Sequence, residues 1–156
     1  MGSNLVESAY EKAVLGIDQA LLVAPYPVWY SHVMNLPLPE RLTYVVVVFH
    51  NQVFNGGFHQ YFFNSYGQFA FEAISCLQLI KAFPQAAILS RATEQLKLKE
   101  PNSEMLIAKI ASRELSCIVD FEEETSEYLD KLDTEYYACD ENLEQLLGSF
   151  LARNIV

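Results

Sequence analysis

Residues 40–65 read ERLTYVVVVFHNQVFNGGFHQYFFNS and decide the fold class of the chain. The first part of this stretch holds four consecutive valines, and β-branched side chains favour a strand over a helix. However, residues 40–54 are long enough for a helix, and the chain contains no second strand-like run that could pair with a strand here. Because a lone strand would leave its backbone groups unpaired, we predict a buried helix over residues 40–54.

The glycine pair that follows predicts a break at the end of this helix. Asn55, Gly56 and Gly57 suit the positive φ angles found at helix C-termini. Phe58 and Tyr61 then stand at helical spacing, and we expect their rings to fill the core. A substitution of Gly57 by alanine is therefore expected to destabilise the domain.

The polar residues around the glycine pair allow two interpretations. In the structural interpretation, Gln60 and Asn64 form hydrogen bonds with backbone groups that the turn leaves free. In the functional interpretation, Asn55, His59, Gln60 and Asn64 line a pocket for a small molecule. We favour the structural interpretation because the surrounding string is so rich in aromatic residues.

The rest of the chain predicts further helices and a single all-α domain over residues 1–156. Residues 4–21 carry apolar side chains at helical spacing. Residues 24–39 contain four prolines and form a connection that cannot be one continuous helix, with Trp29 and Tyr30 expected to hold it against the body. Asp140 is expected to cap the last helix. We predict six or seven helices, the remaining ones at residues 69–83, 84–99, 104–119, 120–132 and 140–153.

The negative charge of the chain is concentrated near its C-terminal end. Twenty acidic and ten basic residues give a net charge of −10. Residues 1–119 hold nine acidic and eight basic side chains, whereas residues 120–156 hold eleven acidic and two basic ones. This balance argues against direct binding of nucleic acid, which requires clustered Lys and Arg.

Five acidic residues are predicted to share one face of a helix over residues 120–132. At about 100° per residue their side chains fall within an arc of about 120°, on the side away from the apolar residues. The acidic residues of this segment would follow one another at about 3 Å along the axis, close to the ~3.4 Å spacing of phosphates on one DNA strand. A plain solvated helix face remains the alternative interpretation. The five residues are Asp120, Glu123, Glu124, Glu127 and Asp130.

The sequence offers little for catalysis or metal binding. No two of the three histidines stand four residues apart, and the three cysteines contain no C-x-x-C pair. Glu72 lies among apolar residues, but we expect it to be a solvated side chain on a helix face. No phosphate-binding glycine pattern occurs. We therefore expect no enzyme activity, no catalytic residues, no cofactor and no metal.

The start of the chain lacks the basic and apolar regions of a signal peptide, and no run is long enough for a membrane helix. Cysteines without a pairing pattern suit a reducing compartment. We expect a cytoplasmic protein with no membrane association.

Two motifs resemble those of a bacterial DNA-mimic-protein family of small helical proteins. The first is the string N-G-G-F-x-Q-Y-F-x-N, which contains Asn55, Gly56, Gly57, Phe58, Gln60, Tyr61 and Asn64. The second is D-x-x-Y-Y, here Asp133, Tyr136 and Tyr137, followed by a last helix. The similarity spans about residues 40–153, and it implies an all-helical fold. The best-known member of this family mimics DNA and binds a transcription regulator.

The resemblance and the charge pattern together favour a non-enzymatic protein–protein interaction module. The resemblance implies an acidic, DNA-like surface that binds the basic face of a nucleic-acid-binding protein, such as a transcription regulator. One alternative is an immunity or inhibitor protein that neutralises a basic toxin. Another is a domain that binds a small molecule at the turn of Asn55–Asn64. The sequence leaves a homodimer open as the oligomeric state.

Overall fold

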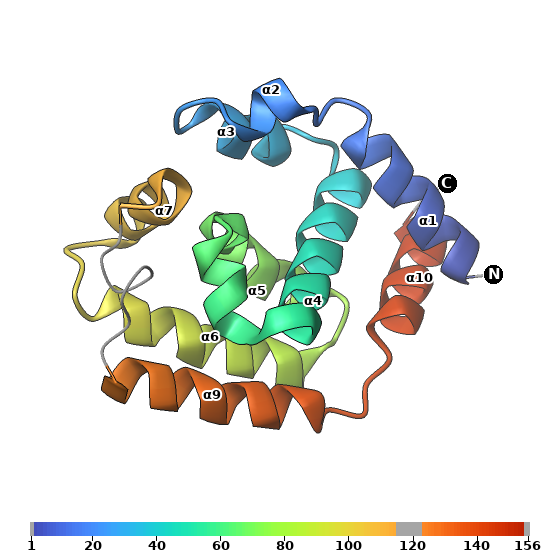
Figure 1. Ribbon diagram of the computed structural model, residues 1–156. Helices are drawn as coiled ribbons and strands as arrows, with labels where there is room; N and C mark the ends of the chain where they lie inside the picture. Colours follow the sequence, from blue (N-terminus) through green and yellow to red (C-terminus); the bar gives the residue numbers. More distant parts are fainter. Residues whose placement is uncertain (1, 115–122, 155–156) are drawn as a thin grey trace.

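A single long helix, α4 (Leu38–Phe63), forms the axis around which the computed structural model is built (Figure 1). The valine run lies inside this helix, and Val45 and Val46 are fully buried. Helices α1 (Gly2–Val14), α5 (Ala70–Leu79), α9 (Glu123–Tyr137) and α10 (Leu143–Asn154) all pack against α4, as does the short 3₁₀ helix η1 (Tyr66–Phe69). The helix predicted over residues 40–54 is therefore confirmed, and burial of its β-branched side chains outweighs their weak helix propensity.

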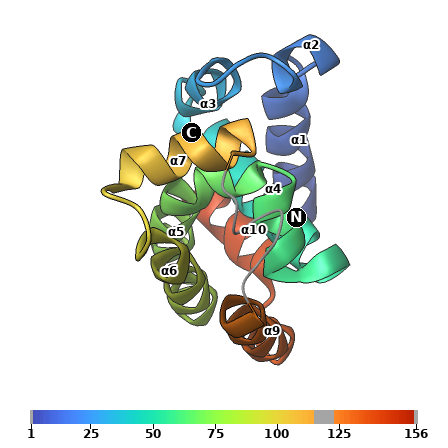
Figure 2. The same cartoon turned by 60° about the vertical axis from the view of Figure 1, so that its left-hand side comes forward.

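The structure describes residues 2–114 and 123–154, and within these ranges it contains helices and no strands. The all-α prediction is thus confirmed, but nine α-helices are present in the described part instead of six or seven. Figures 1 and 2 show α9 at the edge of the molecule opposite α2 and α3. Besides α4, the elements are α1 (Gly2–Val14), α2 (Gln19–Leu22), α3 (Val28–Met34), η1 (Tyr66–Phe69), α5 (Ala70–Leu79), α6 (Phe83–Lys97), α7 (Ser103–Ser112), α9 (Glu123–Tyr137) and α10 (Leu143–Asn154).

The additional helices come from the N-terminal quarter. The helix predicted over residues 4–21 is two helices, because α1 ends at Val14 and the side chain of Asp18 caps α2 by accepting a hydrogen bond from the Leu21 N–H at 2.9 Å. The proline-rich connection holds α3 between its prolines. Arg41 fixes the end of α3, since its Nη1 donates to the carbonyls of Met34 at 3.3 Å and Leu36 at 3.1 Å.

The ends of three further helices differ from the prediction. Helix α7 stops at Ser112 instead of residue 119, because Arg113 adopts a left-handed conformation at φ 56°. Helix α9 continues past Leu132 to Tyr137, so Asp130 lies in the middle of a helix and not near its end. Helix α10 begins at Leu143, and its cap is Asn142 instead of Asp140, because the Asn142 side chain accepts from the Gln145 N–H at 3.1 Å.

Helix α4 bends sharply at its glycine pair. Gly56 has φ −152° and Gly57 has φ 77° and ψ −176°, both outside the helical region. The helix resumes at Phe58, and the rings of Phe58, Tyr61 and Phe62 are fully buried. The bend therefore directs the second half of α4 into the core and leaves the N–H groups at its start without their usual helical partners.

Candidate functional site

The structure places the outer face of α9 at the surface of the molecule. Glu124, Glu127 and Asp130 are exposed, and Glu123 is the first residue of the helix. Asp120 lies outside the described residues. The inner face packs on α4 and α6, and its residues recur at helical spacing. The buried side chains of this inner face are Thr125, Leu129, Leu132 and Tyr136.

The acidic face of α9 is less dense than a DNA strand over its described length. Four exposed carboxylates, at Glu124, Glu127, Asp130 and Glu135, span about 17 Å at about 1.5 Å per residue. The mean axial step is thus about 5.5 Å, against about 3.4 Å for phosphates on one strand. The closer spacing expected from the sequence also counted the acidic side chains of residues 120, 122 and 123, none of which is among the described side chains.

Two basic side chains reduce the charge of this face. Lys131 lines a shallow cavity of about 320 Å³ between α6 and α9, together with Glu124 and Glu127. On α6, Arg91 Nη2 lies 2.8 Å from Glu135 Oε2, with about half of each side chain exposed. Glu124, Glu127 and Asp130 form no ion pair shorter than 4.0 Å with the residues that the structure describes.

A second group of carboxylates lies where α9 leads into α10. Asp140, Glu141 and Glu144 are exposed and line a cavity of about 520 Å³. The sequence assigned Asp140 to capping, so this group was missed. The pattern Asn142-x-x-Gln145 could have revealed the true cap, because an amide three residues after Asn is typical of a helix start. His50 also lines the cavity, together with the apolar residues Val6, Val46, Val47, Leu143 and Leu147.

The two sequence motifs meet in space, where the C-terminal half of α9 holds the bend of α4. Asp133 Oδ1 accepts a hydrogen bond from the Phe58 N–H at 2.8 Å, across 75 positions of the chain. The hydroxyl of Tyr137 donates to the Val53 carbonyl at 2.8 Å. These bonds satisfy an N–H and a C=O group on the two sides of the bend.

Tyr136 adds a third contact between the same two helices. Its hydroxyl lies 2.8 Å from Nδ1 of His50, and its ring packs edge-on against Phe49 and Phe54. Phe54 is nevertheless 53% exposed, and its ring also lies beside that of Tyr137. The C-terminal end of α9 is thus joined to α4 by both hydrogen bonds and aromatic contacts.

The amide side chains near the glycine pair bond with one another. Gln52 Oε1 accepts from Gln60 Nε2 at 3.1 Å and from Asn64 Nδ2 at 2.9 Å. Asn55 Nδ2 donates to Gln60 Oε1 at 3.1 Å. The expectation that Gln60 and Asn64 bond to freed backbone groups is therefore wrong, since Asp133 and Tyr137 perform that role from another helix. Their mutual bonding ties together the two halves of the bent helix.

Burial shifts the pKa values of several groups in this region. Desolvation raises the pKa of Asp133, and the hydrogen bond from the Phe58 N–H partly opposes this shift. Desolvation lowers the pKa of His50, which favours the neutral imidazole. Elsewhere, burial and then the nearby Glu72 raise the pKa of the Cys76 thiol, which makes it a poor nucleophile.

Within residues 2–114 and 123–154, no three His, Cys, Asp or Glu side chains are grouped as metal ligands. Glu72 is half-buried, and its Oε1 lies 3.4 Å from Arg41 Nε, which gives it a structural partner. No helix of the described residues is long and apolar enough to cross a membrane.

The chain belongs to the family of DMP19-like proteins. The model of this family matches residues 34–154, a range that contains the bent helix and all of the described part of α9. No curated protein and no solved structure matches the chain significantly.

The geometry at Gly57 predicts a large loss of stability for Gly57→Ala. A Cβ atom at this position would collide with the Asp133 carboxylate, and φ 77° is unfavourable for alanine. We expect the free energy of unfolding to fall by about 2–4 kcal/mol in urea denaturation. Gly56→Ala should cost less, because its φ is negative, although a Cβ there would also crowd Gln60, whose own Cβ would lie 2.8 Å away. Equal losses for the two variants would contradict this account of the bend.

The hydrogen bond from Phe58 to Asp133 predicts different outcomes for two substitutions of the carboxylate. Asp133→Ala removes the acceptor and should lower the free energy of unfolding by about 1–3 kcal/mol. Asp133→Asn keeps an oxygen acceptor and removes a half-buried charge, so it should change stability by less than about 1 kcal/mol. Asp130→Ala, at an exposed position of the same helix, serves as the control and should be near neutral. A tolerated Asp133→Ala would show that the bend does not need this partner.

The burial of His50 predicts a loss of stability in acid. Because its pKa is lower in the folded state, the unfolded chain takes up a proton first as the pH falls below about 6.5. We expect the drop in unfolding free energy between about pH 7.5 and 5.5 to be smaller in His50→Gln than in the unmodified protein. Asn51→Gln, a substitution without a titratable group at the exposed neighbouring position, should retain the full drop. An unchanged drop in His50→Gln would assign the acid sensitivity to other groups.

Proposed function

We propose that this DMP19-like protein is a non-enzymatic interaction module that binds the basic face of a nucleic-acid-binding protein, such as a transcription regulator. Its binding surface would consist of the exposed carboxylates of α9, namely Glu124, Glu127 and Asp130, and those at the start of α10. The observation that carries the proposal is that these side chains are exposed and lack basic partners among the described residues, in a chain that belongs to this family. The proposed setting is the cytoplasm, where unpaired cysteines are stable.

The rigidity of the surface supports the proposal. Helix α9 is held to α4 through Asp133, Tyr136 and Tyr137, and its inner face is buried against α4 and α6. Carboxylates on a fixed helix lose little backbone entropy when they bind. They also create a steady negative potential, which speeds the encounter with a positively charged partner and weakens as salt is added.

Competition with DNA distinguishes a DNA mimic from other acidic inhibitors. A mimic occupies the surface with which its partner binds phosphates, so DNA and this protein cannot bind together. An immunity protein for a basic toxin could bind elsewhere on its target and tolerate DNA. The small-molecule alternative at the turn of Asn55–Asn64 has less support, because its amide groups bond to one another.

Charge reversal on α9 tests the proposal. The variant Glu124→Lys/Glu127→Lys/Asp130→Lys should fold normally, because all three side chains are exposed. Immobilised unmodified protein should capture DNA-binding proteins from a lysate of the encoding organism, and duplex DNA should release them. The triple variant should lose this capture. Binding to the unmodified protein should also weaken steeply between about 50 and 200 mM salt.

The matched control reverses the same number of charges elsewhere. Glu7, Glu11 and Glu94 are exposed outside α9, and their replacement by lysine changes the net charge equally. This control should retain capture if the location of the carboxylates matters and should lose it if only the net charge matters. Captured proteins that duplex DNA does not release would exclude DNA mimicry, and unchanged capture by the α9 variant would exclude α9 as the binding surface.

A further inference from the structure

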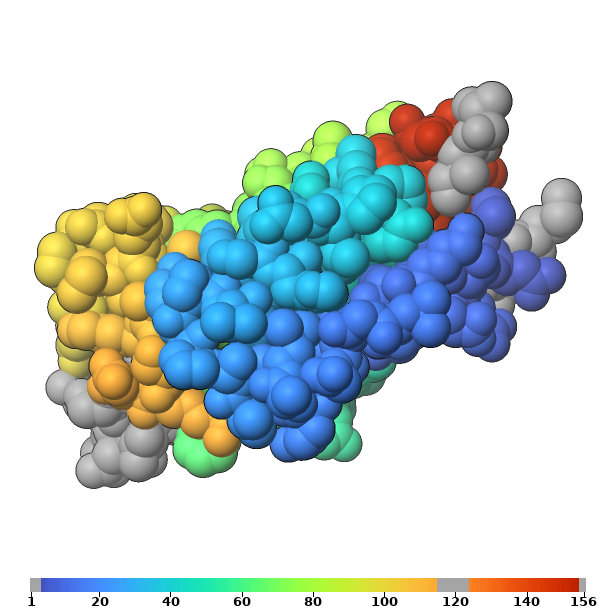
Figure 3. All heavy atoms as spheres, turned by 90° about the horizontal axis from the view of Figure 1, so that it is seen from above, coloured from blue at the N-terminus to red at the C-terminus, as the bar shows by residue number. Residues whose placement is uncertain are grey.

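A third cavity lies at the opposite end of the molecule from α9, between the segment of α2 and α3 and the end of α7. Figure 3 shows these two parts side by side on one face of the molecule. The cavity has a volume of about 520 Å³, and η1 contributes to its wall. Sites for small molecules typically measure about 300–1,000 Å³. Three segments far apart in the chain therefore enclose a space of suitable size for a small ligand.

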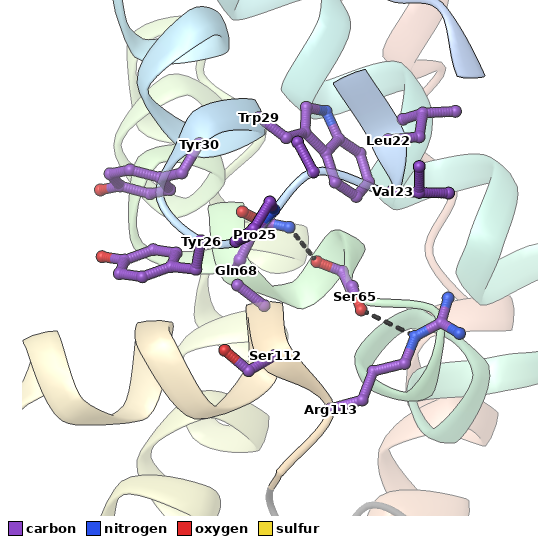
Figure 4. Close-up of a pocket in the computed structure, with 12 residues that line it drawn as sticks. Leu22, Val23, Pro25, Tyr26, Trp29, Tyr30, Ser65, Gln68, Ser112 and Arg113 are labelled. Atoms are coloured by element: carbon purple, nitrogen blue, oxygen red, sulfur yellow. Dashed lines mark hydrogen bonds between the residues drawn. The ribbon is translucent and has the colours of Figure 1, made fainter. Parts of the chain in front are cut away.

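Aromatic side chains form one side of this cavity (Figure 4). Trp29 is 8% exposed, and the rings of Tyr66 and Phe69 meet it edge-on at 5.3 and 5.4 Å. Tyr30 stacks on Phe69 at 5.9 Å, and Tyr26 lies beside Tyr30 at 5.9 Å. Packing therefore fixes the orientation of the wall, so that a flat apolar group could bind without moving it.

Polar groups gather at the other side of the cavity, where Figure 4 shows Arg113 beside Ser65. Arg113 Nε donates to Ser65 Oγ at 3.0 Å, and Ser65 is only 4% exposed. Gln68, also buried, donates from Nε2 to the Ser65 carbonyl at 2.9 Å and holds this residue in place. The bond to Ser65 orients the guanidinium group, and the described residues provide no hydrogen-bond partner for its two Nη atoms.

The charge of the cavity is opposite to that of the whole protein. The chain has twice as many acidic as basic residues, yet among the residues that the structure describes no carboxylate lines this cavity and Arg113 is the one charged residue of its lining. Burial, then Tyr26, and last the carboxylates of Glu72 and Glu104 raise the pKa of the Tyr30 hydroxyl, and neither carboxylate belongs to the lining. A guanidinium group binds a carboxylate through two parallel hydrogen bonds, and one positive charge balances one negative charge.

We propose that this cavity binds a small monocarboxylate with a flat, apolar body. The carboxylate would pair with the Nη atoms of Arg113, and the body would lie along Trp29 and the two tyrosines. The site is independent of the acidic surface of α9, so either proposal can fail without the other.

The chain contains a single tryptophan, Trp29, and its fluorescence therefore reports directly on the cavity. We choose phenylacetate and 3-phenylpropionate as probes, each compared with its neutral amide. The acids should change Trp29 fluorescence in a saturable manner, and the amides should bind at least about tenfold more weakly. The proposal is overturned if neither acid gives a saturable change, or if acids and amides bind equally.

Two arginine variants test whether the acids bind at Arg113. Arg113→Met should weaken binding of the acids at least about tenfold and remove the preference over the amides. Arg91→Met, at an exposed arginine outside the cavity, should bind as the unmodified protein does. Equal affinity in Arg113→Met and the unmodified protein would contradict the assignment of the carboxylate to Arg113.

A second variant tests the site without removing the arginine. Val23 lines the cavity and is 70% exposed, so Val23→Glu should fold and place a negative charge at the entrance. It should weaken binding of the acids more than binding of the amides. Leu15→Glu, at an 84% exposed position outside the cavity, is its matched control. Equal effects of these two substitutions would place the bound acid elsewhere on the protein.

Discussion

The fold depends on one hydrogen bond, from the Phe58 N–H to the carboxylate of Asp133. The bend at Gly57 breaks the helical pairing of α4 and points an N–H group toward α9. Only glycine fits there, because φ is positive and the carboxylate occupies the space of a Cβ atom. A buried N–H group without a partner would cost about 1–3 kcal/mol. The bent helix and the acidic helix therefore stabilise each other, and neither conformation is explained without the other.

This dependence changes how the acidic C-terminal quarter is understood. A segment with such a charge excess could have been a solvated tail, yet α9 contributes Leu129, Leu132 and Tyr136 to the core. Asp133 accepts the hydrogen bond that stabilises the bend of α4, so it is not part of the exposed acidic face. The exposed carboxylates thus stand on a helix whose position is set by the core, which gives the surface a defined shape.

The sequence predicts what depends on local pattern and misses what depends on distant partners. The length and apolar character of residues 40–54 predict a buried helix, and the glycine pair predicts a break. Nothing periodic indicates that Asp133 would bond to Phe58, or that Tyr137 would bond to Val53, because these partners are 75 and 84 positions apart. The short helices α2 and α3 depend on one cap and on Arg41, which are weak local signals. The cavity beside Trp29 joins three separate segments and has no signature in the sequence at all.

The stability of α9 depends much more on its buried apolar side chains than on its exposed charges. Its exposed residues Glu124, Glu127 and Asp130 lie three positions apart, and each such like-charge pair costs only about 0.2–0.5 kcal/mol. The exposed ion pair of Arg91 and Glu135 contributes at most about 1 kcal/mol to stability. Burial of a single leucine side chain contributes about 1.5–3 kcal/mol, and α9 buries two together with Tyr136. The inner face therefore determines whether the helix forms, and the outer face can carry an unbalanced charge at little cost to stability. A loss of binding after charge reversal on this face would consequently report on recognition and not on unfolding.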